Sequence, residues 1–550
     1  MSDVWIDELK KVVKGDVELS EKVLDKYSVD ASIFQLKPEV VVFPKNSRDV
    51  ESLVSFINSK KERFPDLSLT ARAGGTDMTG GCLSESIVLS FTKYFNKIGN
   101  IKAKSVDVEP GVYFRDFEKR TLKKGLIFPT YPASKSICAL GGMISNNSGG
   151  EKSIHYGKTA EHVLKLKVVL SDGKEYEFKK LNRGELNLKI GQKDFEGQIY
   201  REIFNLIDKN YDEIQKARPK VSKNSAGYYL WDVYDKKKGT FDLTQLFTGS
   251  QGTLGIITSA ELELVKKKKH SRLVVCFLNN SKDLVRLVNL ALPYKPESLE
   301  TFDEKTLKLS MRFMPEIAKK MKANIFSLFF SFIGEAFMVL KSGFPKFVVL
   351  VELNEDDPKK LSKRLISLSK RFDLEEINHL VMKSEKAGEK YWTIRRESFN
   401  LLRQKVKGKR ATPFIDDFAV NPKDLPKFFP ELLKILEHYG VEPTLIGHAG
   451  SGNFHIIPLM DLSKASERAK IPVVSEKVYS LLGKYNGTIT AEHNDGLIRT
   501  PYLSKMYSKK VLSLFEKVKD ILDPKDIFNP GKKVHGDMKY AMEHIKKKND

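Results

Sequence analysis

The chain has 550 residues, of which 41% are hydrophobic and 30% are charged, so it is too long for one core and we expect a globular protein of two or three domains. Its net charge of +23 comes with lysines spread along helices rather than gathered beside aromatic side chains, which argues against a nucleic-acid-binding protein. Three cysteines without a Cys-x-x-Cys pair argue against disulfides, an iron–sulfur cluster and a thiolate zinc site.

The N-terminal segment, residues 1–33, is predicted to be helical. Residues 5–26 carry Ile6, Leu9 and Val13 on one stripe, as in a polar helix that packs by one face. The first eight residues are acidic at the start and lack a sustained apolar run, so we expect no signal peptide and a cytoplasmic location.

Residues 34–267 alternate between strands and helices, as in an α+β domain. An Asp-Gly pair at 172–173 between two strand-like runs predicts a hairpin. The other predicted elements are strands at 40–43, 68–71, 87–90 and 106–111 and helices at 48–59 and 113–125.

Three glycine-rich stretches in this half of the chain predict a site for a phosphate-rich ligand. They lie at 69–81, 141–150 and 249–255, with Tyr131-Pro-Ala-Ser134 before the second. Paired glycines let the backbone approach a ligand closely, and neighbouring N–H groups and hydroxyls can donate to anionic oxygens. An isolated Gly-Gly pair more often marks a tight turn, but three such stretches together favour a ligand site. Neither Gly-x-Gly-x-x-Gly nor Gly-x-x-x-x-Gly-Lys-Ser/Thr occurs, which argues against a Rossmann domain and a P-loop.

A second domain is predicted at residues 268–500, beginning after the basic run 266–269. An insertion at about 304–344 holds an apolar run that is shorter than the roughly 20 residues needed to span a bilayer. We interpret it as a buried helix or, alternatively, as a surface helix that touches a membrane or an electron-accepting partner. The other predicted elements are strands at 273–278, 347–353 and 377–382 and helices at 284–292 and 359–372.

Two histidines flank a tight Gly-Ser-Gly turn in the last third of the chain. The turn predicts a hairpin that brings His448 and His455 together on one face. A lone histidine is more often structural, but Glu492 and His493 follow in a second motif. Two imidazoles and a carboxylate with open positions suit Zn²⁺ or another divalent ion that acts as a Lewis acid.

The motifs at 38–50, 72–76 and 249–258 resemble the FAD-binding domain of the vanillyl-alcohol oxidase/p-cresol methylhydroxylase superfamily. The C-terminal half is similar to its FAD-dependent D-2-hydroxyacid dehydrogenases, the group that includes D-lactate dehydrogenase, glycolate oxidase and D-2-hydroxyglutarate dehydrogenase. The resemblance implies an α+β fold, with a two-subdomain p-cresol methylhydroxylase-type FAD-binding domain and an α+β cap domain. Residues 501–550 would then supply a C-terminal helix returning to the flavin and a basic tail.

The resemblance also implies roles for individual residues. His493 would be the catalytic base, Arg395 the anchor of the substrate carboxylate, and His448, His455 and Glu492 the metal ligands. A histidine carries covalent flavin in some relatives where Thr76 stands here, so we expect non-covalent FAD. The FAD-binding residues would be Arg72, Ala73, Gly74, Gly75, Thr76, Asp77, Pro132, Ser134, Gly141, Gly142, Ser145, Asn146, Gly149, Gly252, Gly255, Ile257 and Asn529.

We therefore expect FAD-dependent oxidation of a D-2-hydroxyacid, with zinc as the metal. The alternatives are an oxidase of an alcohol or sugar and a flavoprotein electron-transfer subunit. Electrons would pass to a quinone, an electron-transfer flavoprotein or a cytochrome, and the basic surface suits a peripheral contact at the inner face of the membrane. The predicted strand 413–419 has no lysine and carries Asp416 and Asp417, which favours a small monocarboxylate such as D-lactate or glycolate, although the basic residues at 405–410 could fold back.

Overall fold

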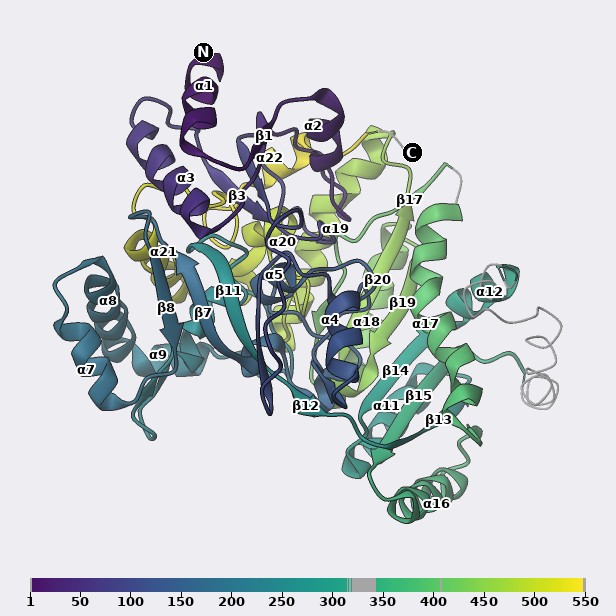
Figure 1. Cartoon of the computed structure of the whole chain (residues 1–550). Coiled ribbons are helices and arrows are strands. Elements are labelled where there is room, and N and C mark those ends of the chain that lie inside the picture. The colour runs from purple at the N-terminus through teal and green to yellow at the C-terminus, as the bar shows by residue number, and fades with distance from the viewer. Residues whose placement is uncertain (1, 314, 316–317, 319–342, 406–407, 548–550) are drawn as a thin grey trace.

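The computed structural model describes residues 2–313, 315, 318, 343–405 and 408–547. Figure 1 shows β-sheets with helices between and around them, so the predicted α+β class is confirmed; three of the sheets have four or more strands. The described part of the chain contains no helix that is both long and apolar enough to cross a membrane. The apolar runs of the predicted insertion, at 325–334 and 336–340, lie outside the described residues; α12 (Glu304–Arg312) is described at the start of that region.

The first sheet has the order β1-β2-β4-β3 and is parallel except at its β1 edge. Strands β2 and β4 are buried along their whole length, which explains why they are short, continuous apolar runs. Helix α3 covers the sheet, and its first turn is capped by the side chain of Asn46, which accepts from the N–H of Asp49. The bounds are β1 Asp16–Glu18, β2 Val40–Phe43, β3 Leu69–Arg72, β4 Ile87–Ser90 and α3 Ser47–Lys60.

The single helix predicted over 5–26 is wrong, because the chain forms a strand in the middle of that range. Helix α1 (Ser2–Val12) ends early, β1 pairs with β2, and α2 (Glu21–Tyr27) follows. At Gly15 a Cβ would lie 2.1 Å from the carbonyl oxygen of Phe43, so only glycine lets the chain approach the sheet this closely. Pairing with β2 therefore overrides the helical pattern.

The second sheet is antiparallel, with the order β5-β11-β7-β8. The predicted Asp-Gly hairpin is its β7–β8 pair, in which Gly173 has a φ of 80° at the turn. The bounds are β5 Ser105–Val108, β7 Val163–Val169, β8 Glu175–Lys179 and β11 Ile256–Glu263.

The third and largest sheet belongs to the C-terminal half and has the order β16-β13-β15-β14-β19-β20-β17, with β18 also paired to β20. Its side chains alternate between two apolar layers, as the pleat requires: Leu273 and Val275 face one layer, and Val274 and Cys276 face the other. The bounds are β13 His270–Leu278, β14 Ser298–Asp303, β15 Phe347–Glu355, β16 His379–Val381, β17 Arg410–Ala411, β18 Phe418–Ala419, β19 Pro443–His448 and β20 Asn453–Met460.

Helices cover both faces of this sheet, with α11 and α16 on one face and α12 and α17 on the other. Their bounds are α11 Ser281–Ala291, α16 Pro358–Leu374 and α17 Glu385–Lys405. The remaining main helices are α4 Phe114–Leu122, α5 Leu140–Ser145, α6 Ser153–Tyr156, α7 Arg183–Gly191, α8 Phe195–Lys209, α9 Tyr211–Ala217, α10 Thr244–Phe247, α18 Leu425–His438, α19 Ala465–Lys484, α20 Gly496–Arg499, α21 Lys509–Leu522 and α22 Met538–Glu543. Short strands pair as β6 (Leu126–Ile127) with β12 (Val265–Lys266) and β9 (Tyr234–Asp235) with β10 (Thr240–Phe241).

After α21 the chain returns to the first sheet. Ile527 and Phe528 are fully buried in the same core as β2, β3 and β4. The carbonyl oxygen of Ile527 accepts from the N–H of Leu69 at 2.7 Å. The N-terminal and C-terminal halves are therefore joined beside the first glycine-rich loop, which begins at the end of β3.

The strand predicted over 413–419 is also wrong, because only Phe418–Ala419 pairs as β18. Asp417 has a φ of 67°, a left-handed conformation that an extended strand excludes. Both Asp416 and Asp417 are fully buried, so this stretch is an internal turn that carries two carboxylates.

Candidate active site

A cavity of about 450 Å³ lies where the glycine-rich loops of the first half face the histidine hairpin of the second. This volume is within the usual range for small-molecule sites, ~300–1,000 Å³. We call the side formed by residues 72–77, 132–134, 141–149 and 252–257 the glycine-loop wall, and the side formed by His448, His455, Glu492 and His493 the histidine wall. Of the predicted site residues, the cavity is lined by Arg72, Ala73, Gly74, Gly75, Thr76, Asp77, Pro132, Ser134, Gly141, Gly142, Ser145, Asn146, Gly149, Gly252, Gly255, Ile257, Arg395, His448, His455, Glu492 and His493.

The second glycine loop of this wall packs closely against the protein on the side away from the cavity. At Gly141 a Cβ would lie 2.5 Å from the Cβ of Pro110, so the loop packs against that residue without a side chain. At Gly142 the nearest atom to an added Cβ is the Cβ of Ala73, 3.7 Å away, so a methyl group there would occupy the cavity itself. The loop presents few side chains to the cavity, so a large ligand can lie directly against its backbone.

Asp77 fixes the first glycine loop rather than offering a free charge to the cavity. Its Oδ2 accepts from the N–H groups of Thr79 and Gly81, and its Oδ1 accepts from the side-chain amide of Asn146 at 3.0 Å. The first and second glycine loops are therefore tied to each other. The groups that remain free to donate to a ligand are backbone N–H groups and hydroxyls, as a diphosphate requires.

Asn529 is the one predicted site residue that does not line the cavity. Its side-chain amide donates to the carbonyl oxygens of Gly81 and Gln251, at 2.8 and 2.7 Å, and both of those residues line the cavity. Its side-chain oxygen accepts from Thr70. Because its polar atoms are engaged in this way, Asn529 supports the cavity wall from behind.

His448 and His455 come together through the register of the β19–β20 hairpin. Ile446 is paired with His455, and His448 with Asn453, so the two histidines are diagonal neighbours on one face. Their ring centroids are 5.3 Å apart. The predicted hairpin and the proximity of its two histidines are thus both present.

Both imidazoles point toward one oxygen of Glu492. The Nε2 atoms of His448 and His455 lie 3.0 and 3.4 Å from Glu492 Oε1. Each ring is held on its other side by a carboxylate, Glu300 at 2.7 Å for His448 and Asp416 at 3.1 Å for His455. This second carboxylate is what orients a metal-ligating histidine, because it fixes the Nδ1 proton and leaves Nε2 to bind.

The chemistry of this donor set fits a divalent metal ion. If each Nδ1–H donates to its carboxylate, a neutral imidazole presents a lone pair at Nε2, and a lone pair facing a carboxylate oxygen is unfavourable. A cation among the three atoms removes that repulsion. In the absence of an ion, burial alone lowers the pKa of His455, but Asp416 and Glu492 outweigh it and raise the pKa to about 10.

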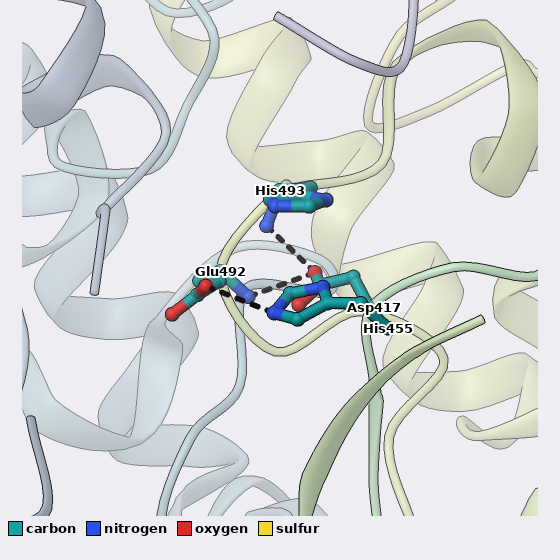
Figure 2. A group of neighbouring side chains, drawn as sticks. All are labelled: Asp417, His455, Glu492 and His493. Atoms are coloured by element: carbon teal, nitrogen blue, oxygen red, sulfur yellow. Dashed lines mark hydrogen bonds and ion pairs between the residues drawn. The ribbon is translucent and has the colours of Figure 1, made fainter. Parts of the chain in front are cut away.

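Asp417 lies close enough to join a metal group with His455, Glu492 and His493, whose ligand atoms all lie within 4.8 Å of one another (Figure 2). Its oxygens are already used, however. Oδ2 accepts from three consecutive backbone N–H groups, those of Ala491, Glu492 and His493, at 2.7–2.9 Å. It also accepts from the Thr490 hydroxyl, and Oδ1 accepts from the Asn453 amide. Asp417 therefore shapes the loop that carries Glu492 and His493, and is the poorer ligand of the four.

His493 faces the cavity from the same loop, and Asp416 lies behind it. The Nδ1 atom of His493 is 2.8 Å from Asp416 Oδ2, while the other oxygen of Asp416 accepts from His455. The rings of His455 and His493 are stacked with centroids 5.0 Å apart. Burial lowers the pKa of His493, but Asp417 and Asp416 outweigh it and raise it above the usual value. One carboxylate thus orients both histidines.

Two arginines of α17 line the cavity, each paired with a buried glutamate. Arg395 lies 2.7 Å from Glu300 Oε2, so Glu300 joins this arginine to His448. Arg396 donates from Nε to Glu151 at 3.1 Å, and Glu151 also accepts from the Tyr131 hydroxyl. Both guanidiniums are held in place before any substrate arrives.

The buried charged residues that hold the site histidines and arginines in place are not predicted by the sequence. Glu300, Lys223 and the loop-shaping role of Asp417 carry no local signal, because their partners are far away in the chain. In the sequence, the adjacent Asp416 and Asp417 argue only against a second substrate carboxylate. Two neighbouring acidic residues in an otherwise apolar stretch were the available clue that both are buried and paired.

Comparison with known families matches the two halves of the chain separately. Residues 38–179 match the family described as "FAD binding domain", and residues 267–533 match "FAD linked oxidases, C-terminal domain". The fold is similar to that of p-cresol methylhydroxylase, with a TM-score of 0.68 at 14% identity, covering 97% of this chain and 96% of that one. The FAD-binding half thus has the p-cresol methylhydroxylase-type fold.

Among curated relatives, the chain is 26% identical to a D-2-hydroxyglutarate dehydrogenase of Pseudomonas putida over 94% of its own length, but spans only 50% of that protein. The chain thus spans about half the length of the first curated relatives it matches. It is 24% identical to a D-lactate dehydrogenase of Archaeoglobus fulgidus, covering 96% of this chain and 99% of that one.

Proposed function

The chain belongs to the FAD-linked oxidases, with the FAD binding domain and the C-terminal domain of that group, and from this premise we propose that it oxidises a D-2-hydroxyacid to the 2-oxoacid. The observation that carries the proposal is the meeting of the histidine wall and two paired arginines at one cavity with the glycine-loop wall. A protein that only passed electrons would need neither. The named activities of the relatives, on D-2-hydroxyglutarate and D-lactate, support the same class of substrate.

FAD would be held by the glycine-loop wall, where the absence of a side chain at Gly142 leaves room for it. When bound, FAD supplies the acceptor of the hydride, which carries both electrons of the oxidation. We propose that it is not covalently attached, because Thr76 has no nucleophilic nitrogen. The protein should purify yellow and release its flavin on acid precipitation. Flavin that stays with the precipitated chain would contradict this.

In the proposed reaction, Arg395 anchors the substrate carboxylate and His493 takes the proton of the C2 hydroxyl. A guanidinium binds a carboxylate through two parallel hydrogen bonds, and Glu300 keeps Arg395 aligned for this. Asp416 orients His493 and stabilises the imidazolium that forms when the proton arrives. Arg395 and Asp416 are buried, so the groups that hold the substrate carboxylate and orient the base are shielded from water.

His448, His455 and Glu492 would hold a divalent metal ion, zinc being our choice because two imidazoles and a carboxylate are typical of its catalytic sites. Such an ion supplies Lewis-acid polarisation of the substrate oxygens and, by like-charge repulsion, opposes protonation of nearby imidazoles. The three side chains keep their ligand atoms convergent because Glu300 and Asp416 fix both rings from behind.

We favour a small monocarboxylate, such as D-lactate or glycolate, over a dicarboxylate. Each cavity arginine is already balanced by a buried glutamate, and the stretch 413–419 adds two buried carboxylates rather than a lysine. Lys405 and Lys407 could serve a second carboxylate, but their side chains are not among those that the structure describes. Faster flavin reduction by D-2-hydroxyglutarate than by D-lactate would reverse this preference.

The test of the whole proposal is anaerobic mixing of the FAD-loaded protein with a panel of D- and L-2-hydroxyacids. Loss of the flavin absorbance band with a D-2-hydroxyacid, and not with its L-enantiomer, is the expected result. Reduction by simple alcohols or sugars instead would favour the alternative, a superfamily oxidase. If no member of the panel reduces the flavin, while an artificial donor does, the protein acts as an electron-transfer subunit.

A further inference from the structure

The segment 222–227 comes from the first half of the chain but is fastened to the loop that carries Glu492 and His493. The N–H of Ser225 donates to the carbonyl oxygen of Thr490, and the N–H of Gly227 donates to Asp495 Oδ2, both at 2.9 Å. Residues 222–227 lie outside the helices and strands, and these bonds tie the segment to the other half of the chain.

Lys223 is the residue of this segment that reaches the metal ligands. Its side chain is 1% exposed, and its Nζ lies 2.9 Å from Glu492 Oε2. It also donates to the carbonyl oxygen of Gly150 and to the side-chain oxygen of Asn453, both at 3.3 Å. Three donors of one ammonium thus meet three acceptors, one each from the glycine-loop region, the hairpin and the Glu492 loop.

This contact divides the two oxygens of Glu492 between different partners. Oε2 is taken by Lys223, while Oε1 faces His448 and His455. On the Oε2 side the carboxylate is packed against the glycine loop, because a Cβ added at Gly149 would lie 3.0 Å from that atom. Lys223 itself does not line the cavity, so it acts behind Glu492.

We propose that Lys223 is a positioning residue that fixes Glu492 as a one-oxygen ligand of the metal ion and so makes metal affinity depend on the join between the two halves of the chain. The inference rests on the metal site of the proposed function. Without the ammonium, the buried carboxylate loses the partner that keeps Oε1 turned toward the histidines. Removal of a group that orients a ligand typically weakens metal binding ~10–100-fold.

Lys533 provides a matched control. It is fully buried, lies 2.8 Å from Asp495 in an ion pair, and donates to the carbonyl oxygen of Ser225 at 3.0 Å. It therefore ties the same two segments together, but touches none of the proposed ligands. Lys223→Met and Lys533→Met remove equally buried ammonium groups and differ in whether Glu492 loses its partner.

The experiment uses the full chain loaded with FAD and titrated with Zn²⁺ in chelator-buffered solutions. Bound zinc per flavin is measured by mass spectrometry, and thermal stability is measured beside it. We expect Lys223→Met to bind Zn²⁺ ~10–100-fold more weakly than wild type. Lys533→Met is expected to melt at a lower temperature yet keep the wild-type Zn²⁺ affinity.

Wild-type zinc affinity in Lys223→Met, or an equal loss in both variants, overturns the proposal while leaving the metal site in place. If wild type itself binds no zinc, the metal site of the proposed function fails, and the role of Lys223 fails with it. Should Lys223→Met not fold with FAD, Lys223→Gln, which keeps two donors but no charge, is measured instead. A wild-type affinity in that variant overturns the proposal as well.

Discussion

The two walls of the cavity are built on different physical principles. The glycine-loop wall consists of short, closely packed loops that present backbone groups and hydroxyls to the cavity. Its charged residues Asp77 and Arg72 form hydrogen bonds within the protein. The histidine wall consists of side chains from separate segments, held by buried carboxylates and an ammonium. A large ligand with many polar atoms can be bound by backbone groups and hydroxyls. A small reacting centre needs charged side chains whose orientation is fixed before the substrate binds.

The sharpest way to separate the walls is to remove a ligand from the histidine wall. His455→Ala is expected to lose bound metal and to abolish flavin reduction by substrate, because a Zn²⁺ site with two of its three protein ligands is incomplete. FAD should stay, since the glycine-loop wall is untouched. Metal by mass spectrometry and flavin by absorbance check this. Wild-type protein that reduces its flavin at full rate after its metal is stripped would contradict the Lewis-acid role.

His493→Asn separates the base from the metal within the same wall. The variant should keep both metal and FAD and reduce its flavin ~10²–10⁴-fold more slowly, the usual contribution of a positioned general base. Single-turnover reduction by substrate, followed by stopped-flow absorbance, measures the loss. A variant that also loses its metal would mean that His493 is itself a ligand.

Arg395→Lys tests whether the substrate carboxylate is held at this wall. Lysine keeps the charge and loses the paired hydrogen bonds, each worth ~1.5–3 kcal/mol when charged, so the half-saturating substrate concentration should rise ~10–100-fold. The limiting rate of flavin reduction should change less. Arg396→Lys is the matched control, because Arg396 also lines the cavity and is likewise paired with a buried glutamate, Glu151. A larger effect from Arg396→Lys would move the anchor to that residue.

Gly142→Ala probes the glycine-loop wall without a clash inside the protein. An added Cβ meets only Ala73, at 3.7 Å, so the variant should fold normally but bind FAD more weakly. Gly141→Ala, its neighbour, would force a Cβ to within 2.5 Å of Pro110 and should cost stability instead, about 1–3 kcal/mol. FAD titration and thermal melts of the apoproteins distinguish the two. Normal FAD affinity in Gly142→Ala would mean that the cofactor lies elsewhere in the cavity.

Asp30, which lines the cavity beside the glycine-loop wall, is expected to make the stability of the protein depend on pH. Burial, together with Asp77, raises the pKa of Asp30 from 3.8 to about 7. Ionising it therefore costs the folded state more than the unfolded one, a penalty absent below about pH 4 and complete above about pH 7. Asp30→Asn should raise the melting temperature of the apoprotein at pH 8 and leave it unchanged at pH 4. The same shift at both values would exclude Asp30 as the cause.

The sequence by itself determined the features whose cause is local. The three glycine loops follow from residues that are adjacent in the chain, and the meeting of His448 and His455 follows from a two-residue period on either side of a tight turn. The short apolar runs of β2 and β4 likewise determined that these strands are buried on both faces. Such features can be predicted from the sequence because the residues that interact lie within a few positions of each other.

Only the tertiary structure decided how the histidine wall is held. Glu300 and His448 are 148 residues apart, Lys223 and Glu492 are 269 apart, and even Asp416 lies 39 residues before His455. No periodicity encodes such pairs, because a buried charge is selected by whichever opposite charge or donor the fold brings to it. For the same reason the 5–26 helix and the 413–419 strand were wrong: pairing of β1 with β2 and the hydrogen bonds of Asp417 overrode the local preference.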